Sequence, residues 1–244
     1  MTEPLLAVRH LSKSFDGVDA VRDASLSIRA GEVVAVIGPN GAGKTTLFNL
    51  IHGELRADAG DVRFDGRSIA GLPTHAIARL GIARTFQVAA TFASMTVRES
   101  IALALAADRD VGVMLPMLPL HASTTEPVLA RFGLGGLADA HCAALAYGDA
   151  KRLELAMALA GAPKLLLMDE PTAGMTPRSR RELMQRVVDL AHTNGISILF
   201  TEHDMDVVFG FAERVIVLDR GMPIAEGPPE AIRENAIVRR AYLG

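Results

Sequence analysis

Residues Gly38–Thr46 read GPNGAGKTT, and the apolar run Val33–Ile37 leads directly into them. The segment matches the pattern G-x-x-x-x-G-K-S/T in full, in which a strand delivers the chain to a glycine-rich loop that opens a helix. Glycines at positions 38, 41 and 43 let successive backbone N–H groups point into one concavity, where they can surround phosphate oxygens. The sequence therefore predicts a phosphate-binding loop that holds a nucleotide.

Side chains around this loop suit the same ligand. Lys44 can reach the outer phosphates as a point charge, and Thr45 can offer its hydroxyl to Mg2+. A helix expected from about Gly43 to His52 directs its positive end at the anion. A chance glycine-rich turn of this pattern is expected in roughly one chain of this length in a hundred, so a second motif is needed. The predicted contacts to the nucleotide are Gly38, Pro39, Asn40, Gly41, Ala42, Gly43, Lys44, Thr45 and Thr46.

The second motif is LLLMDE at Leu165–Glu170, an apolar run that ends in two carboxylates. It is typical of a central parallel strand whose C-terminal end faces a site. A core strand closed by surface acids would look the same on its own. Behind a phosphate-binding loop the functional interpretation is favoured, since such loops work with an acidic strand end. Asp169 is then predicted to support Mg2+, and Glu170 to polarise the attacking water.

Composition indicates a soluble intracellular enzyme. The chain has 244 residues, a formal net charge of -3 and one cysteine, which excludes a disulfide framework. Cys142 has no His or Cys partner at ligand spacing and receives no role. The start, MTEPLLAVRH, lacks a cationic segment followed by a long apolar one, and no apolar run reaches the ~18 residues of a spanning helix. The acidic balance gives no electrostatic footprint for nucleic acid, and the local basic patch at 178–181 is more typical of a solvated helix face.

The hydrophobic pattern predicts an α/β fold. Short alternating strands over residues 5–35, followed by a turn and strand at GDVRFDG, form a β-rich flank. Strand-like runs at 164–168, 197–201 and 215–219 alternate with amphipathic helices such as 177–192, as in a parallel sheet. The nucleotide is expected at the C-terminal ends of these strands.

Between about Phe86 and Ala160 the chain changes to alanine-rich helical segments such as IALALAA and ARFGLGGLADA. We interpret this stretch as an inserted helical lobe. The Met and Leu residues at 113–120 suit the core of that lobe or a partner-facing patch. The prediction is one domain over 1–244, with a nucleotide-binding core formed by 1–86 and 161–244 and an antiparallel β flank, and a lobe over about 87–160.

The order of these motifs closely resembles the ATP-binding subunits of ABC transporters, whose core is a P-loop NTPase, along nearly the whole chain. Phe15 lies where that family places an aromatic that stacks on adenine, although FDG also suits a plain hairpin turn. Gln87 in ARTFQ matches the glutamine that joins the core to the helical lobe; a surface amide is the alternative. His203 in LFTEHDMDVV matches the switch histidine that contacts the γ-phosphate, against the alternative of a structural histidine at a strand end. EPTAGMTP from Glu170 matches the loop that crosses the dimer interface.

LAYGDAKRLELAMALA, from Leu145, resembles the family signature but departs from its commonest form, LSGGQ. Ala146 replaces serine, Tyr147 replaces the first glycine and Asp149 replaces glutamine, while Gly148 is kept. Losing a hydroxyl bond to a charged phosphate costs about 1.5 to 3 kcal/mol unless backbone N–H groups of the following helix carry the contact, which we favour. The Ala-Tyr-Gly form resembles the branched-chain amino acid subgroup, where a glutamine is expected at the position of Ala150.

The resemblance implies a head-to-tail dimer, with ATP sandwiched between the phosphate loop of one subunit and Ala146, Tyr147, Gly148 and Asp149 of the other. ATP then biases the closed state. The implied Mg2+ ligands are Thr45, Gln87 and Asp169, directly or through water. The implied catalytic set is Lys44 and His203 on the γ-phosphate, Glu170 activating water, and Gln87.

The residues of these motifs most resemble those of the ATPase of a branched-chain or related amino acid importer, with a lipopolysaccharide-export ATPase as the alternative. The implied partners are transmembrane permease subunits, a second ABC ATPase that is a paralogue or another copy, and, indirectly, a solute-binding protein. The place of action is the cytoplasmic face of the membrane, peripherally. Two further hypotheses are a soluble ABC clamp acting on nucleic acid, in translation or in cofactor assembly, and a regulatory module without turnover. The presence of both Glu170 and His203 argues against the last.

Overall fold

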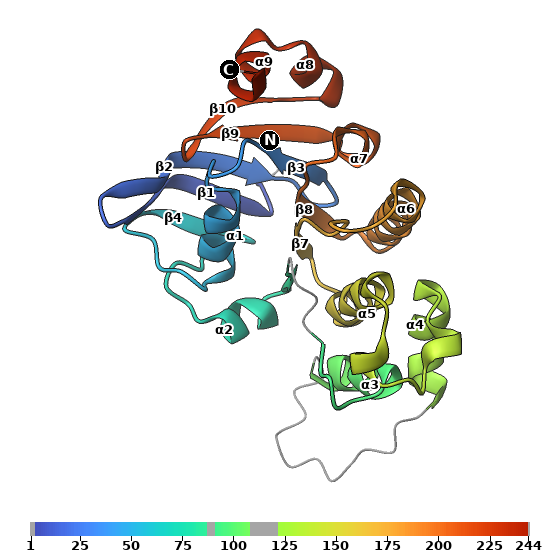
Figure 1. Cartoon of the computed structure of the whole chain (residues 1–244). Helices are drawn as coiled ribbons and strands as arrows, with labels where there is room; N and C mark the ends of the chain where they lie inside the picture. Colours follow the sequence, from blue (N-terminus) through green and yellow to red (C-terminus); the bar gives the residue numbers. More distant parts are fainter. Residues whose placement is uncertain (1–2, 87–90, 108–121, 244) are drawn as a thin grey trace.

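The computed structural model describes residues 3–86, 91–107 and 122–243 (Figure 1). Its strands are β1 (Leu6–Phe15), β2 (Val18–Ile28), β3 (Val33–Ile37), β4 (Ala59–Phe64), β5 (Arg67–Ser68), β6 (Ile82–Thr85), β7 (Leu165–Asp169), β8 (Ser197–Thr201), β9 (Arg214–Asp219) and β10 (Met222–Gly227). Its α-helices are α1 (Lys44–His52), α2 (Thr74–Arg79), α3 (Val97–Ala107), α4 (Ala122–Phe132), α5 (Tyr147–Ala160), α6 (Pro177–Asn194), α7 (Met205–Phe211), α8 (Pro229–Glu234) and α9 (Ala236–Leu243).

The central sheet has the order β10-β9-β3-β8-β7-β6, and all its neighbours are parallel except β10 and β9. Every residue of β3, β7 and β8 is buried, as the continuous apolar runs predicted. Alternate residues serve two cores: Val33, Ala35 and Ile37 pack with helices α5, α6 and α7, whereas Val34 and Val36 pack with α1 and the second sheet. The predicted α/β core is confirmed, and its strands agree with the expected runs to within one residue.

The β-rich flank is a second, antiparallel sheet with the order β2-β1-β4-β5. Asp16 and Gly17 join β1 to β2 with φ of 47° and 83°, the conformation of a tight hairpin turn. β2 is longer than the predicted run ASLSI because its polar first half pairs with β1, from Val18 opposite Phe15 onward. Cross-strand pairing supplies there the stability that the local sequence does not signal.

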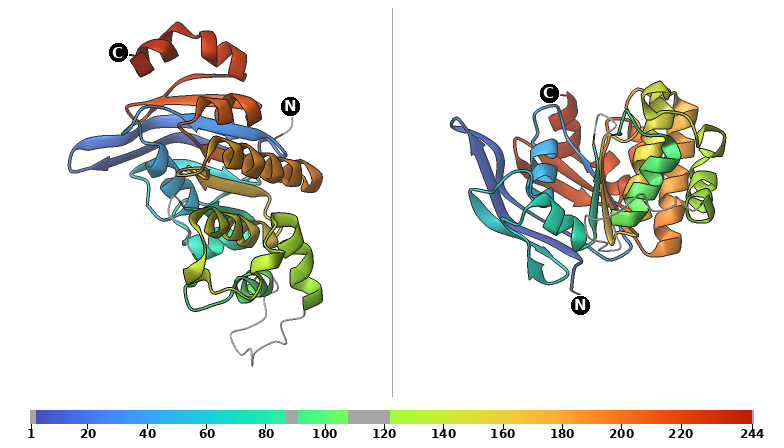
Figure 2. Two further views of the ribbon diagram at one scale, coloured as in Figure 1. Left: turned by 45° about the vertical axis from the view of Figure 1, so that its right-hand side comes forward. Right: turned by 90° about the horizontal axis from the view of Figure 1, so that it is seen from below.

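Helices α3, α4 and α5 come between β6 and β7 and lie beyond one edge of the parallel sheet, on the opposite side from the antiparallel sheet (Figures 1 and 2). The expected helix over ARFGLGGLADA is wrong in its second half. α4 ends at Phe132 because Gly133 takes a φ of 67°, and a short 3-10 turn, Gly135–Leu137, follows. The strand β6 was not predicted, and the division near residues 86 and 160 stays a prediction.

A buried carboxylate fixes the entry to β3. Glu32 accepts hydrogen bonds from Arg214 at 2.7 and 2.8 Å and from the side chain and backbone of Arg29 at 2.8 and 2.9 Å. Burial alone would raise the pKa of Glu32, but these bonds outweigh it and lower the pKa to about 2. Arg214 is the first residue of β9, so this network links the start of β3 to its neighbouring strand.

In the described part of the chain no helix is both long and apolar enough to span a membrane. Cys142 is buried in the core beside α3, with its Sγ 3.3 Å from the Ser100 hydroxyl.

Candidate active site

The phosphate loop runs from the end of β3 to Lys44, the first residue of α1. Gly43 precedes the helix with a φ of 96°, and a side chain there would place its Cβ 2.2 Å from the carbonyl oxygen of Ala20. Gly38 has the same kind of close neighbour, since its Cβ would lie 2.2 Å from the Leu218 carbonyl oxygen. Gly41, at a φ of 79°, instead faces open space. Two glycines therefore let the loop pack against β2 and β9, while the third keeps the mouth of the loop open.

Lys44 lies across this loop. Its Nζ donates hydrogen bonds to the carbonyl oxygens of Gly38 at 2.7 Å and Pro39 at 3.1 Å. The residue is buried, and burial lowers the pKa of its ammonium, while the nearby carboxylates of Glu170 and Asp169 act in the opposite sense. The arrangement holds a positive charge beneath the loop, facing the two acids at the end of β7.

Asp169 ends β7 beside Thr201, which ends β8. The Thr201 hydroxyl donates to Asp169 Oδ1 at 2.7 Å and accepts from the backbone N–H of Glu170 at 3.0 Å. One buried hydroxyl thus holds both the carboxylate of Asp169 and the backbone N–H of Glu170 in position. Sequence reasoning missed Thr201; its position as the last residue of the apolar run before His203 was the available signal.

Glu170 and His203, predicted from motifs far apart in the chain, lie together. His203 Nε2 is 2.7 Å from Glu170 Oε1, and because a carboxylate only accepts, the imidazole donates this bond. Glu170 has a φ of 48°, a conformation that non-glycine residues seldom adopt outside functional or tightly held positions. Its side chain is 20 % exposed and that of His203 is 47 % exposed, so both groups are open to a ligand.

Two more charged groups that the sequence did not single out support these residues. Arg84 on β6 is buried, with its guanidinium 3.2 Å from Glu54 and 3.7 Å from Asp169, and burial lowers its pKa. Glu202, just before His203, accepts from the hydroxyl of Thr172 at 2.6 Å and from its backbone N–H at 2.9 Å. These contacts fix the Asp169 carboxylate and the loop after Glu170.

The signature segment lies at the N-terminus of α5. Ala146 is the N-cap residue, and its side chain forms no capping hydrogen bond. Its carbonyl oxygen accepts hydrogen bonds from the N–H groups of Asp149 and Ala150. Ala146 and Tyr147 are exposed. α5 belongs to the core on the opposite face of the parallel sheet from α1. The segment therefore does not share a face with the phosphate loop of its own chain.

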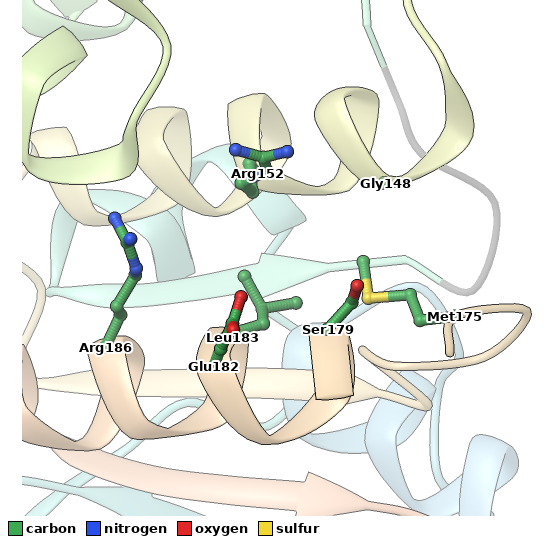
Figure 3. Close-up of a pocket in the computed structure, with 7 residues that line it drawn as sticks. All are labelled: Gly148, Arg152, Met175, Ser179, Glu182, Leu183 and Arg186. Atoms are coloured by element: carbon green, nitrogen blue, oxygen red, sulfur yellow. The ribbon is translucent and has the colours of Figure 1, made fainter. Parts of the chain in front are cut away.

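Within the chain, the signature segment contacts the loop EPTAGMTP. A Cβ on Gly174 would lie 3.4 Å from the ring of Tyr147, and one on Gly148 would lie 4.0 Å from Met175. Asp149 accepts from Arg152 at 2.5 Å. Figure 3 shows the pocket between α5 and α6 next to this contact, which is lined by Gly148, Arg152, Met175, Ser179, Glu182, Leu183 and Arg186.

The remaining predicted residues are less closely assembled. Phe15 ends β1 and is partly exposed, with the Lys13 ammonium 5.4 Å from its ring centre, so the hairpin turn exists and the adenine contact stays a prediction. Asn40 and Thr45 are exposed in the loop region, and Ala42 is buried. Gln87 lies outside the described residues. The roles of all these residues, and of Gly38, Pro39, Gly41, Gly43, Lys44, Thr46, Gly148 and Asp149, stay predictions.

The fold and the loop define an ATP-binding cassette. The family model described as ABC transporter matches residues 21–173, and the chain belongs to this family of transport ATPases, which bind nucleotide and couple ATP hydrolysis to transport. A second model, described as branched-chain amino acid ATP-binding cassette transporter, matches residues 223–244. The resemblance and the fold class inferred from the sequence are both confirmed.

Similar proteins agree over the full length. The high-affinity branched-chain amino acid transport ATP-binding protein LivG of Salmonella typhimurium is 40% identical over 100% of this chain and 99% of its own length. The corresponding BraF of Pseudomonas aeruginosa is 36% identical over the same shares. A crystal structure of an ABC transporter ATP-binding cassette in its ADP conformation has a TM-score of 0.87 and 30% sequence identity, and the match covers 100% of both chains.

Proposed function

We propose that the chain binds and hydrolyses ATP to power the import of branched-chain or related amino acids. The observation that carries the substrate class is the agreement of two independent comparisons: the relatives named for branched-chain amino acid transport align over the whole chain, and the subgroup model matches its last residues, 223–244. That match favours the importer over the lipopolysaccharide exporter. The soluble clamp has no such support.

For hydrolysis, we infer that Glu170 orients and deprotonates water while His203 contacts the terminal phosphate. The 2.7 Å bond from His203 Nε2 to Oε1 orients the Glu170 carboxylate, whose side chain is 20 % exposed. Lys44 would exchange its bonds to two loop carbonyls for bonds to phosphate oxygens, which are stronger acceptors for an ammonium. Positioning and charge stabilisation supply most of the rate enhancement in phosphoryl transfer.

The residues present fit Mg2+. Asp169 presents a carboxylate already held by Thr201, and Thr45 presents an exposed hydroxyl at the start of α1. Among the described residues, no group of three or more His, Cys, Asp or Glu side chains is placed to hold a metal ion. Thr45, Asp169 and Gln87 would hold it. When bound, Mg2+ neutralises charge that develops on the phosphate oxygens.

A head-to-tail dimer would complete the site. The exposed N-terminal turn of α5 offers backbone N–H groups and a positive helix end to phosphate, so the serine replaced by Ala146 is not required for the contact. We propose that Ala146, Tyr147, Gly148 and Asp149 of one subunit cover the nucleotide on the phosphate loop of the other. The second subunit is another copy or a paralogue.

A groove between the two parts of the molecule suits a membrane partner. It has a volume of about 680 Å³, and its lining residues include the apolar Ile82, Phe86, Met157 and Pro163 as well as the charged Arg79. An amphipathic helix binds such a groove with its apolar face. We propose that a short helix of a transmembrane permease subunit docks here, which places the chain peripherally on the cytoplasmic face of the membrane, with a solute-binding protein acting through the permease.

The test replaces Glu170 by Gln in the purified chain. We expect ATP hydrolysis, measured as phosphate release, to fall by about 10²-fold or more while ATP binding is retained. Glu234→Gln, an exposed acid on α8, is the matched control and should hydrolyse ATP normally. Near-normal turnover of Glu170→Gln would remove this residue from its role.

The transport assignment is tested separately. Glu170→Gln with bound ATP should retain, from native membranes, two hydrophobic permease subunits and a second ATPase, identified by mass spectrometry. Recovery of soluble partners only would refute the membrane assignment while leaving the ATPase chemistry intact.

A further inference from the structure

A buried ion pair lies on one face of α5. Lys151 Nζ is 3.1 Å from Glu154 Oε2, and the two side chains are only 1 % and 5 % exposed. Removing two charges from water is costly, so such a pair persists only when further hydrogen bonds satisfy its remaining donors and acceptors. Those bonds show what the pair holds.

Both side chains bind the backbone of Phe86. Lys151 donates to the carbonyl oxygen of Phe86, and Glu154 accepts from the N–H of the same residue at 2.8 Å. The residue that follows the last residue of β6 is thus held by its donor and its acceptor together, across 65 and 68 positions of sequence. A shift of Phe86 would break two hydrogen bonds to buried charged groups.

We call Lys151, Glu154 and the Phe86 backbone the clamp. It lies next to the chain that continues to Gln87, to the start of α5 and to the groove proposed for the permease helix. Phe86 is followed directly by Gln87 in sequence. Four residues before Lys151, Tyr147 begins α5 and packs against Gly174 in the loop after Glu170. Glu154 and Phe86 also line the groove proposed for the permease helix.

We propose that Lys151 and Glu154 are positioning residues for ATP hydrolysis, which fix the chain leading to Gln87 to the helix that carries the signature segment. The inference rests on the proposed function, because it gives the groove a physical connection to the active site. Both side chains are buried and act through the Phe86 backbone.

A double variant separates positioning from stability. Lys151→Met with Glu154→Leu replaces the pair by apolar groups of similar size, a change that is often neutral or stabilising for a buried ion pair, whereas removing one partner is strongly destabilising. We expect the double variant to stay folded, with a single cooperative thermal transition, and to lose about tenfold or more in kcat. KM for ATP should stay within about twofold, because the phosphate loop is untouched. A kcat within twofold of wild type would overturn the proposal.

Two controls accompany this variant. Glu154→Gln keeps an oxygen that can accept from the Phe86 N–H but leaves the Lys151 ammonium buried without its counter-charge, so it should lower Tm more than the double variant does. Arg178→Met with Glu182→Leu removes an exposed pair of similar spacing on α6 and should change neither Tm nor kcat appreciably. Loss of activity in the α6 variant as large as in the clamp variant would also refute a specific role.

Hydrogen exchange gives a readout that needs no turnover. The Phe86 amide should exchange at least about tenfold faster in the double variant, while the amides of β3 remain unchanged. If wild type fails to hydrolyse ATP, the proposed function fails, yet this exchange still decides the clamp. Equal exchange at Phe86 in both proteins would show that the pair does not hold that peptide.

Discussion

Replacing Thr201 by Val should destabilise the protein, whereas the same replacement at Thr85 should not. Both threonines lie in the parallel sheet and are buried, at 0 % and 1 % exposure. The Thr201 hydroxyl donates to the Asp169 carboxylate at 2.7 Å. Within the described residues, the Thr85 hydroxyl has no hydrogen-bond partner. The two substitutions remove the same atom from the same kind of surroundings and differ in what that atom binds.

The magnitudes follow from these contacts. A hydrogen bond to a charged group contributes about 1.5 to 3 kcal/mol, and the Glu170 N–H keeps a second acceptor, the Thr201 carbonyl oxygen at 3.2 Å, so only the bond to Asp169 is counted. For a chain of this size 1 kcal/mol shifts Tm by roughly 2 to 4 °C, so Thr201→Val should lower Tm by about 3 to 12 °C. Thr85→Val removes a buried unsatisfied hydroxyl, which costs about 1 to 3 kcal/mol, and should leave Tm unchanged or raise it.

Calorimetry on the nucleotide-free variants checks the difference, because bound ATP would itself raise Tm. Phosphate release measured in parallel should fall for Thr201→Val, since Asp169 loses the group that orients it. Equal shifts of Tm in both variants, or a Thr201→Val protein as stable as wild type, would refute the view that this hydroxyl sets the end of β7.

The remaining predictions concern pH and the phosphate loop. The pKa of Glu32 is lowered from 4.5 to about 2 in the folded protein, so this group contributes about 3 kcal/mol to the free energy of unfolding above pH 4.5 and loses that contribution as pH falls toward 2. The difference in Tm between wild type and Glu32→Gln should therefore shrink between pH 7 and pH 3. A difference that grows on acidification would contradict this. Gly43→Ala should lower Tm more than Gly41→Ala, because both take a positive φ but only the new Cβ at Gly43 meets a backbone oxygen, that of Ala20 at 2.2 Å; thermal unfolding of the two variants compares them, and equal losses would mean that the close contact relaxes freely.

Most of the core was predictable because its signals are local. The runs at Val33–Ile37 and Ser197–Thr201 are apolar throughout and end beside motif residues, so both strands and the edge of the sheet that carries the site follow from sequence. The contact between Glu170 and His203 follows as well, since parallel strands place their C-terminal ends together.

The parts that escaped prediction depend on contacts distant in sequence. β6 has only four residues, Ile82–Thr85, and becomes a strand by pairing with β7. Arg84 is a charged residue whose burial is compensated by acids from two other segments, which no local pattern signals. Lys151 and Glu154 sit in a polar-looking stretch of the signature and gave no indication that both would be buried. Long-range pairing, rather than propensity, decides these positions.

The placement of α5 has a mechanical consequence. It is the crossover helix that returns the chain to β7, and Leu153, Leu155 and Ala156 join the core on that face of the sheet. Its 14 residues make a rigid rod of about 21 Å, and Ala146 and Tyr147 are exposed at its signature end. A tilt of about 10° around the C-terminal end would carry Tyr147 through about 4 Å, by the length of that rod. A hydrogen bond exists at about 3 Å and is lost at about 4 Å. In the proposed dimer, a small rotation at the sheet would therefore be enough to engage or release a nucleotide on the facing subunit.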